Sequence, residues 1–286
     1  MFKNLSLKEI GLNVSMREGA RLAKIGKFEG MDLKIEEAVE LTENFSFSYV
    51  EGIFASFNIK IGGWRIPFKW DGSEKEYEEG IEKLKKFAEI AGKLRAFRTY
   101  TSICPFSDHL PYDENFQFHV KRLKKIAEIL KENGCSLGLE FIGTPSMRKN
   151  HKYQFIHSLQ EILELREKIG LENVGVLLDS WHLFTSKTHF SFIKNLKKTD
   201  IVYVHVSDAP KEIPVEEFEN DKRYLPGETG VINLVEFLKF LKEIEYDGPV
   251  TPEPFNEKVN KLPPEIAVRL TGGYLSNLFQ KVFKEK

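Results

Sequence analysis

The sequence has very little cysteine and no long hydrophobic run, and each absence excludes a class of protein. Cys104 and Cys135 are its only cysteines in 286 residues. This excludes the disulfide framework of small secreted domains and predicts a reducing, cytoplasmic location. No apolar stretch approaches the roughly 20 residues that a membrane-spanning helix needs. Residues 1–8 also lack the apolar core of a signal peptide. We therefore expect no membrane partner.

An excess of charge of one sign is also missing. Lys+Arg number 42 and Asp+Glu number 43, which leaves a formal net charge of -1. Because no global positive field attracts phosphates, we expect no nucleic-acid partner. No stretch rich in Pro, Gly or Ser divides the chain, which predicts a single domain over residues 1–286. That length is typical of one (β/α)8 barrel.

Four short apolar runs in the second half each lead to a residue that can bind a metal ion. The runs are rich in Val, Ile and Leu, which is typical of buried parallel strands. They are residues 137–139 before Glu140, 174–178 before Asp179, 201–204 before His205, and 249–252 before Glu253. The segments between them have helical periodicity. Strands alternating with helices, and polar residues at the strands' carboxyl ends, predict a (β/α)8 TIM barrel with its site on that face.

The first half can be divided into the same repeating unit. It predicts strands over Glu9–Val14, Phe28–Ile35, Ala55–Ile61 and Phe97–Ile103. It predicts helices over residues 17–25, 36–42, 76–94 and 115–133. The tail, Asn256–Lys286, is expected to form one extra C-terminal helix. The side chains expected to pack inward from it are Leu270, Tyr274, Leu278 and Phe279.

The four strand-end residues together predict one divalent metal ion. Three carboxylates that converge without a cation would repel one another and would be expensive to bury. A set of three carboxylates and one imidazole, Glu140, Asp179, His205 and Glu253, suits Mn²⁺, Co²⁺ or Mg²⁺ and also accepts Zn²⁺. We expect Mn²⁺. Such a site leaves coordination positions open for a substrate with adjacent oxygens.

Five short motifs carry a resemblance to a known family. In chain order they read LEFIG from Leu139, LDSWH from Leu178, HVSD from His205, RYLPGE from Arg223 and EPF from Glu253. They resemble the xylose-isomerase-like TIM barrel superfamily of sugar isomerases and epimerases, and most of all its inosose isomerase and ketose 3-epimerase branch. The likeness in motifs covers about residues 137–255.

This resemblance implies roles for individual residues. The four ligands would hold the metal, and Glu140 and Glu253 would also be the catalytic acid and base. The substrate would be a small polyhydroxy ketone, a ketose or an inosose, which reacts through an enediolate. His182 and Arg223 would hold substrate oxygens. Alternatively, His182 orients Asp179, and Arg223 forms a loop salt bridge to Asp221 or Glu228.

Two further residues are candidates for substrate contact. His157 lies in the loop-to-helix region after Glu140, and Trp64 is one of three tryptophans that could line a pocket. Aromatic residues are, however, more often part of a core. The sequence permits a homo-oligomer without requiring one.

Two other enzyme classes remain open. An inosose dehydratase-type lyase could use the same barrel and metal, because enediolate formation is common to both reactions. An endonuclease IV-like abasic-site nuclease shares the barrel and several ligands, but it needs further histidines. Here Arg223 stands where that family's D-x-H motif has its histidine, and the residues directly after the third and fourth predicted strands, Gly62–Arg65 and Cys104–Phe106, include no histidine.

Overall fold

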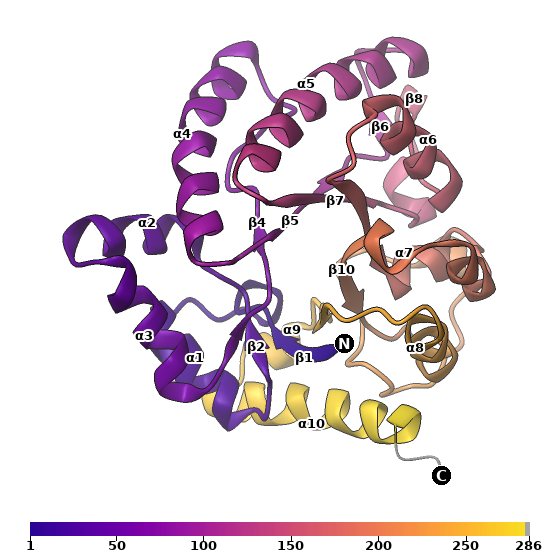
Figure 1. Ribbon diagram of the computed structural model, residues 1–286. Helices are drawn as coiled ribbons and strands as arrows, with labels where there is room; N and C mark the ends of the chain where they lie inside the picture. The colour runs from indigo at the N-terminus through magenta and orange to yellow at the C-terminus, as the bar shows by residue number, and fades with distance from the viewer. Residues whose placement is uncertain (284–286) are drawn as a thin grey trace.

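The computed structural model describes residues 1–283 and shows a closed parallel barrel (Figure 1). Its strands are β1 Phe2–Leu5, β2 Gly30–Met31, β3 Lys60–Ile61, β4 Trp64–Arg65, β5 Arg98–Ile103, β7 Ser136–Phe141, β9 Val174–Asp179, β10 Ile201–Val206 and β11 Pro249–Pro252. They follow the order β3-β2-β1-β11-β10-β9-β7-β5-β4, and every pair is parallel. β3 and β4 are two parts of one barrel strand, so eight strands form the barrel and the predicted fold is confirmed.

Gly62 and Gly63 connect the two parts of this closing strand. β3 pairs with β2 and β4 pairs with β5, so the segment joins the two edges of the sheet. A Cβ atom on Gly62 would lie 2.1 Å from Asn4 Oδ1, and one on Gly63 would lie 2.8 Å from Tyr203 Cε2. Both glycines are therefore needed because interior side chains occupy the space beside this strand.

Helices surround the strands (Figure 1). They are α1 Met16–Ile25, α2 Ile35–Asn44, α3 Phe47–Phe57, α4 Glu74–Lys93, α5 Tyr112–Glu132, α6 Leu159–Ile169, α7 Ser180–Thr185, α8 Leu234–Glu243, α9 Glu257–Asn260 and α10 Pro264–Phe283. Short 3-10 helices are η1 Lys8–Ile10, η2 Pro145–Arg148, η3 Phe190–Asn195, η4 Lys198–Asp200 and η5 Val215–Glu217. A small antiparallel pair, β6 Phe106–Ser107 and β8 Tyr153–Gln154, joins the loops after β5 and β7. Within residues 1–283, no helix is both long and apolar enough to cross a bilayer.

The hydrophobic core lies between the barrel and the helices. α4 shows how the sequence produces it: its apolar residues recur at helical spacing, so that Ile81, Leu84 and Ala88 lie on one buried face. Ser73 begins this helix with a capping box to Glu76. The buried cluster that results runs from Leu5 to Val282. The barrel interior holds a separate apolar cluster, Tyr100, Leu177 and Tyr203.

Two of the strands predicted in the first half are wrong. Residues 9–14 do not form the first strand: β1 is Phe2–Leu5, and Glu9 lies in η1. β1 is easily missed because it is short and because its Asn4 points into the barrel, where it is fully buried. The third predicted strand, Ala55–Ile61, begins inside α3, and only Lys60–Ile61 is extended. The second prediction is right in place but too long, since β2 covers Gly30–Met31.

The tail forms two helices where one was expected. α9 ends at Asn260, and α10 begins at Pro264 after Pro263. The break follows from the two prolines, which cannot donate backbone hydrogen bonds within a helix. Leu278 packs inward as predicted, but Leu270 is exposed. Tyr274 and Phe279 are half-buried against the core. The last part of the predicted helix, residues 284–286, lies outside the described residues.

Candidate metal centre and substrate cavity

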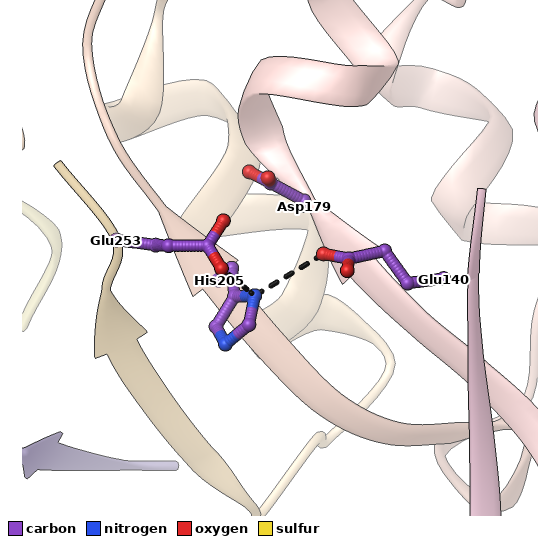
Figure 2. Close-up of side chains that lie close together, drawn as sticks. All are labelled: Glu140, Asp179, His205 and Glu253. Atoms are coloured by element: carbon purple, nitrogen blue, oxygen red, sulfur yellow. Dashed lines mark hydrogen bonds and ion pairs between the residues drawn. The ribbon is translucent and has the colours of Figure 1, made fainter. Parts of the chain in front are cut away.

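The four predicted ligands come from four strands that are neighbours in the barrel. Glu140 lies near the end of β7, Asp179 is the last residue of β9, His205 is near the end of β10, and Glu253 follows β11. In the ladder His205 pairs with Asp179 and with Thr251. Because parallel strands end at the same face of a barrel, these side chains meet at its carboxyl-terminal mouth. Figure 2 shows them converging.

Their donor atoms lie close enough to share one cation. One atom from each of the four residues lies within 4.8 Å of all the others. His205 Nδ1 lies 3.2 Å from Glu140 Oε1 and 3.3 Å from Glu253 Oε1 (Figure 2). All four side chains are buried. Three carboxylates and an imidazole nitrogen at this separation are a donor set that fits a divalent metal ion. Within residues 1–283 it is the one group of this kind.

The negative field of this cluster favours positive charge at its centre. Burial lowers the pKa of His205, but the carboxylates of Glu253 and Glu140 raise it more strongly, to about 10. Burial raises the pKa of Glu253 well above its usual range, and the charge of Glu140 adds to the rise. Both shifts have the same origin, since several carboxylates share one dry site. A divalent cation at the centre would relieve this repulsion.

Arg223 binds the outer oxygens of two of the four residues. Its Nη1 donates to Asp179 Oδ2 at 2.7 Å and to Glu253 Oε2 at 2.6 Å. The guanidinium is 1% exposed and is enclosed by the rings of Trp181 and Phe255. Burial opposes ionisation of Asp179, yet Arg223 and the nearby histidines hold its pKa below the usual value. The salt bridges expected as the alternative, to Asp221 or Glu228, do not occur among the described contacts.

His182 lies between Asp179 and Arg223. Burial lowers its pKa to about 4, so the imidazole is neutral at physiological pH. The backbone N–H of Gly143 donates to Nδ1 at 3.2 Å, which assigns the proton to Nε2. Nε2 lies 3.5 Å from Asp179 Oδ2. This geometry is that of a residue that orients Asp179, and its contact with substrate stays a prediction.

The two weaker candidates lie elsewhere. Trp64 is fully buried in the hydrophobic core, and its indole N–H donates to the carbonyl of Ala96 at 2.9 Å. A buried indole whose N–H is already bonded cannot contact a substrate, so the structure does not support Trp64 as a substrate-binding residue. His157 is half-buried, and its Nδ1 lies 2.7 Å from the carbonyl oxygen of Phe155. No contact joins it to the four ligands within the described residues.

A cavity of about 730 Å³ opens on the other half of the barrel mouth. Its walls come from the loops after β1, β2 and β4 and from β5, and they include Glu9, Asp32, Arg65 and Tyr100. The rings of Tyr100 and His205 meet edge to face with centroids 5.6 Å apart, which places the cavity beside the metal ligands. Sequence reasoning missed Glu9 and Asp32 because it assigned both to strands.

Asp32 is held by a polar network in the barrel interior. It accepts hydrogen bonds from Asn4 Nδ2 at 2.8 Å, from the Tyr203 hydroxyl at 2.6 Å and from the Tyr100 hydroxyl at 3.0 Å. Burial raises the pKa of Asp32 to about 6, and these hydrogen bonds limit the rise. Thr251 joins the network through Tyr203. The side chains therefore form a rigid base beneath the cavity and beneath His205.

Asp208 fixes the loop that carries Arg223. Its carboxylate accepts from the backbone N–H groups of Thr229, Gly230 and Ile232 at 2.7–3.0 Å. Its backbone also pairs with Tyr224, the residue after Arg223. The HVSD motif thus contains both the predicted ligand His205 and Asp208, which anchors the loop. The sequence pattern did not reveal this role of Asp208.

A family comparison identifies the barrel. A profile described as "Xylose isomerase-like TIM barrel" matches residues 9–271. The chain belongs to the xylose isomerase-like TIM barrel family. The match includes all four ligands, Arg223 and His182, so the motifs and the site they form lie inside the family's common domain.

Four of the similar curated proteins are inosose isomerases, and another is a 3-dehydroshikimate dehydratase of Pseudomonas putida, 26% identical over 51% of this chain and 22% of that protein. The chain is 29% identical over 198 residues to an inosose isomerase of Halalkalibacterium halodurans. The aligned residues make up 68% of this chain and 66% of that protein. It is 22% identical over 275 residues to an inosose isomerase of Bacillus velezensis, covering 94% and 95% of the two chains. Among solved structures, the IOLI protein with a binding zinc atom has a TM-score of 0.81 at 21% identity and matches 99% of each chain.

Proposed function

We propose that this protein is a divalent-metal-dependent isomerase or epimerase that moves a proton next to the ketone of a ketose or inosose. The observation that carries the proposal is the pair Glu140 and Glu253. Both carboxylates face His205 Nδ1, at 3.2 and 3.3 Å, beside a cavity large enough for a small sugar. The names of the relatives above support the substrate class.

The proposed centre holds one metal ion through Glu140, Asp179, His205 and Glu253. When bound, such an ion polarises a carbonyl and a neighbouring hydroxyl and so acidifies the carbon-bound proton. We favour Mn²⁺ because carboxylate oxygens dominate the set, while Co²⁺, Mg²⁺ and Zn²⁺ suit the same donors.

The protein's own residues supply proton transfer and orientation. The two glutamates, one on β7 and one after β11, approach the centre from different strands, so one can remove a proton and the other can return one. Arg223 occupies the far oxygen of Glu253 and leaves Oε1 directed at the centre. This fixes the orientation of the proposed base. In this proposal Arg223 also donates to a substrate oxygen that gains charge.

The proposal is tested by incubating the Mn²⁺-loaded protein with a panel of ketoses and inososes in D₂O. NMR should show deuterium incorporated at one carbon adjacent to the ketone, and the exchange should stop when the metal is removed with EDTA. Glu253→Gln should reduce exchange about 100-fold or more, while Glu40→Gln, an exposed change of the same kind outside the cavity, should leave it unchanged. Loss of water with formation of an unsaturated ketone would instead identify a dehydratase. Metal-dependent cleavage of abasic DNA without exchange on any sugar would refute the proposal.

A further inference from the structure

The floor of the cavity contains a carboxylate oxygen that nothing binds. Glu9 is 2% exposed, and its Oε2 has no hydrogen-bond partner among residues 1–283. The same residue lines the cavity. A buried carboxylate oxygen without a donor is unfavourable in a folded protein. Such a group is expected where a ligand supplies the missing donor.

Glu9 reaches the cavity from the barrel strand next to the one that Glu253 follows. It comes from η1 after β1, whereas the ligands come from β7, β9, β10 and β11. It is still close enough for its charge to raise the pKa of both Glu253 and Tyr100. A small molecule whose ketone is held at the ligands and whose body fills the cavity therefore meets Glu9.

The cations that line the cavity lie at its rim. Four cationic residues line it, Lys8, Lys34, Arg65 and Lys69. Three of these are exposed, and Lys34 is paired with Glu37 at 2.8 Å. No ion pair reaches Glu9 or Asp32 within the described part of the chain. The floor is consequently acidic and accepts hydrogen bonds, while the cations remain at the rim in contact with solvent.

We propose that Glu9 is a substrate-recognition residue that accepts a hydrogen bond from a hydroxyl of a neutral polyhydroxy ketone and repels substrates that place a phosphate or carboxylate beside it. The inference rests on the proposed function, because it concerns the same cavity. Hydroxyls are donors, and a hydrogen bond to a carboxylate is stronger than one to a neutral acceptor. An anion placed beside Glu9 would meet a like charge in a site screened poorly by water.

The test uses Glu9→Ala and Glu9→Gln, with Glu40→Gln as the control because Glu40 is an exposed carboxylate on α2 that does not line the cavity. The neutral ligand is the panel member that exchanges, or 2-keto-myo-inositol if none does. The acidic ligand is 3-dehydroshikimate, a cyclic hydroxy ketone with a carboxylate. Dissociation constants are measured by calorimetry on the Mn²⁺-loaded proteins, alongside KM and kcat.

We expect Glu9→Ala to weaken binding of the neutral ligand roughly 10- to 100-fold, with the loss mainly in KM. Glu9→Gln should shift the ratio of neutral to acidic affinity at least about tenfold toward the acid. Its melting temperature should stay the same or rise, because an unpaired buried charge is removed. A melting temperature several degrees lower would make Glu9 a structural residue and overturn the inference.

The two proposals fail in different ways. If exchange occurs but both Glu9 variants behave like Glu40→Gln, the recognition role is refuted and the isomerase remains. If no ligand exchanges, but the neutral ligand binds and Glu9→Ala weakens it, Glu9 keeps its role and the isomerase is refuted. If the unmodified protein binds the acid as tightly as the neutral ligand, the cavity does not select by charge and the inference is wrong.

Discussion

Replacing Arg223 by alanine tests whether the metal ion and this guanidinium both neutralise the negative charge of the buried carboxylates. Arg223 is 1% exposed and pairs with Asp179 and Glu253, which are themselves buried. Removing one partner from a buried ion pair costs about 3–5 kcal/mol, because it leaves the other charge unpaired. At about 2 °C per kcal/mol for a chain of this size, metal-free Arg223→Ala should melt about 6–10 °C below the unmodified protein.

The metal should reverse part of this loss. A ligand present at 100 times its dissociation constant stabilises the folded state by about 2.7 kcal/mol. Arg223→Ala removes a cation that repels the metal ion, so the variant should bind Mn²⁺ at least as tightly and gain at least as much. The difference in melting temperature should therefore shrink in Mn²⁺ relative to EDTA.

Arg122→Ala is the matched control for this comparison. Arg122 is also a buried arginine, paired with Glu74 and stacked on Tyr77, but it lies away from the ligands. Its loss of stability should be the same with and without Mn²⁺. Scanning calorimetry of both variants in EDTA and in Mn²⁺ measures the effect. If Mn²⁺ leaves the deficit of Arg223→Ala as unchanged as that of Arg122→Ala, the charge-balance argument fails.

Three further outcomes follow from the site. Glu253→Gln keeps an oxygen ligand but removes the base, so proton exchange should fall by about 100-fold or more while metal analysis still finds bound Mn²⁺; full activity would make Glu253 a ligand only. His205→Ala should weaken the metal, so raising Mn²⁺ should restore part of the activity, and a loss that no Mn²⁺ concentration reverses would contradict this. Burial raises the pKa of Asp32 to about 6, whereas the unfolded side chain titrates near 3.9. The stabilisation that the protonated carboxyl gives the folded protein is therefore complete below about pH 4 and is lost as the pH rises through 6. Asp32→Asn should remove about 3 kcal/mol of that decline, measured by urea unfolding of the metal-free proteins at pH 4 and pH 7; parallel profiles would argue against it.

The convergence of the four predicted metal ligands could be foreseen because their placement depends on short-range pattern and on one topological rule. Runs such as 174–178 are apolar throughout, so they are identified as buried strands without any knowledge of their neighbours. Parallel strands joined by helices end at one face, which brings Asp179 and His205 together although 25 residues separate them in the chain. Local composition and handed connections together determined this half of the mouth.

The other half depended on tertiary structure. β1 has the polar residue Asn4 inside the barrel, and the closing strand is divided at Gly62 and Gly63, so neither shows a strand pattern in the sequence. The sequence therefore predicts a strand at Glu9, although Glu9 lines the cavity from η1. Arg223 shows the same limit, since its nearest acids in the sequence are Asp221 and Glu228 while its partners are Asp179 and Glu253. Which oxygen a buried guanidinium meets depends on how distant loops pack, and residue spacing carries no information about that.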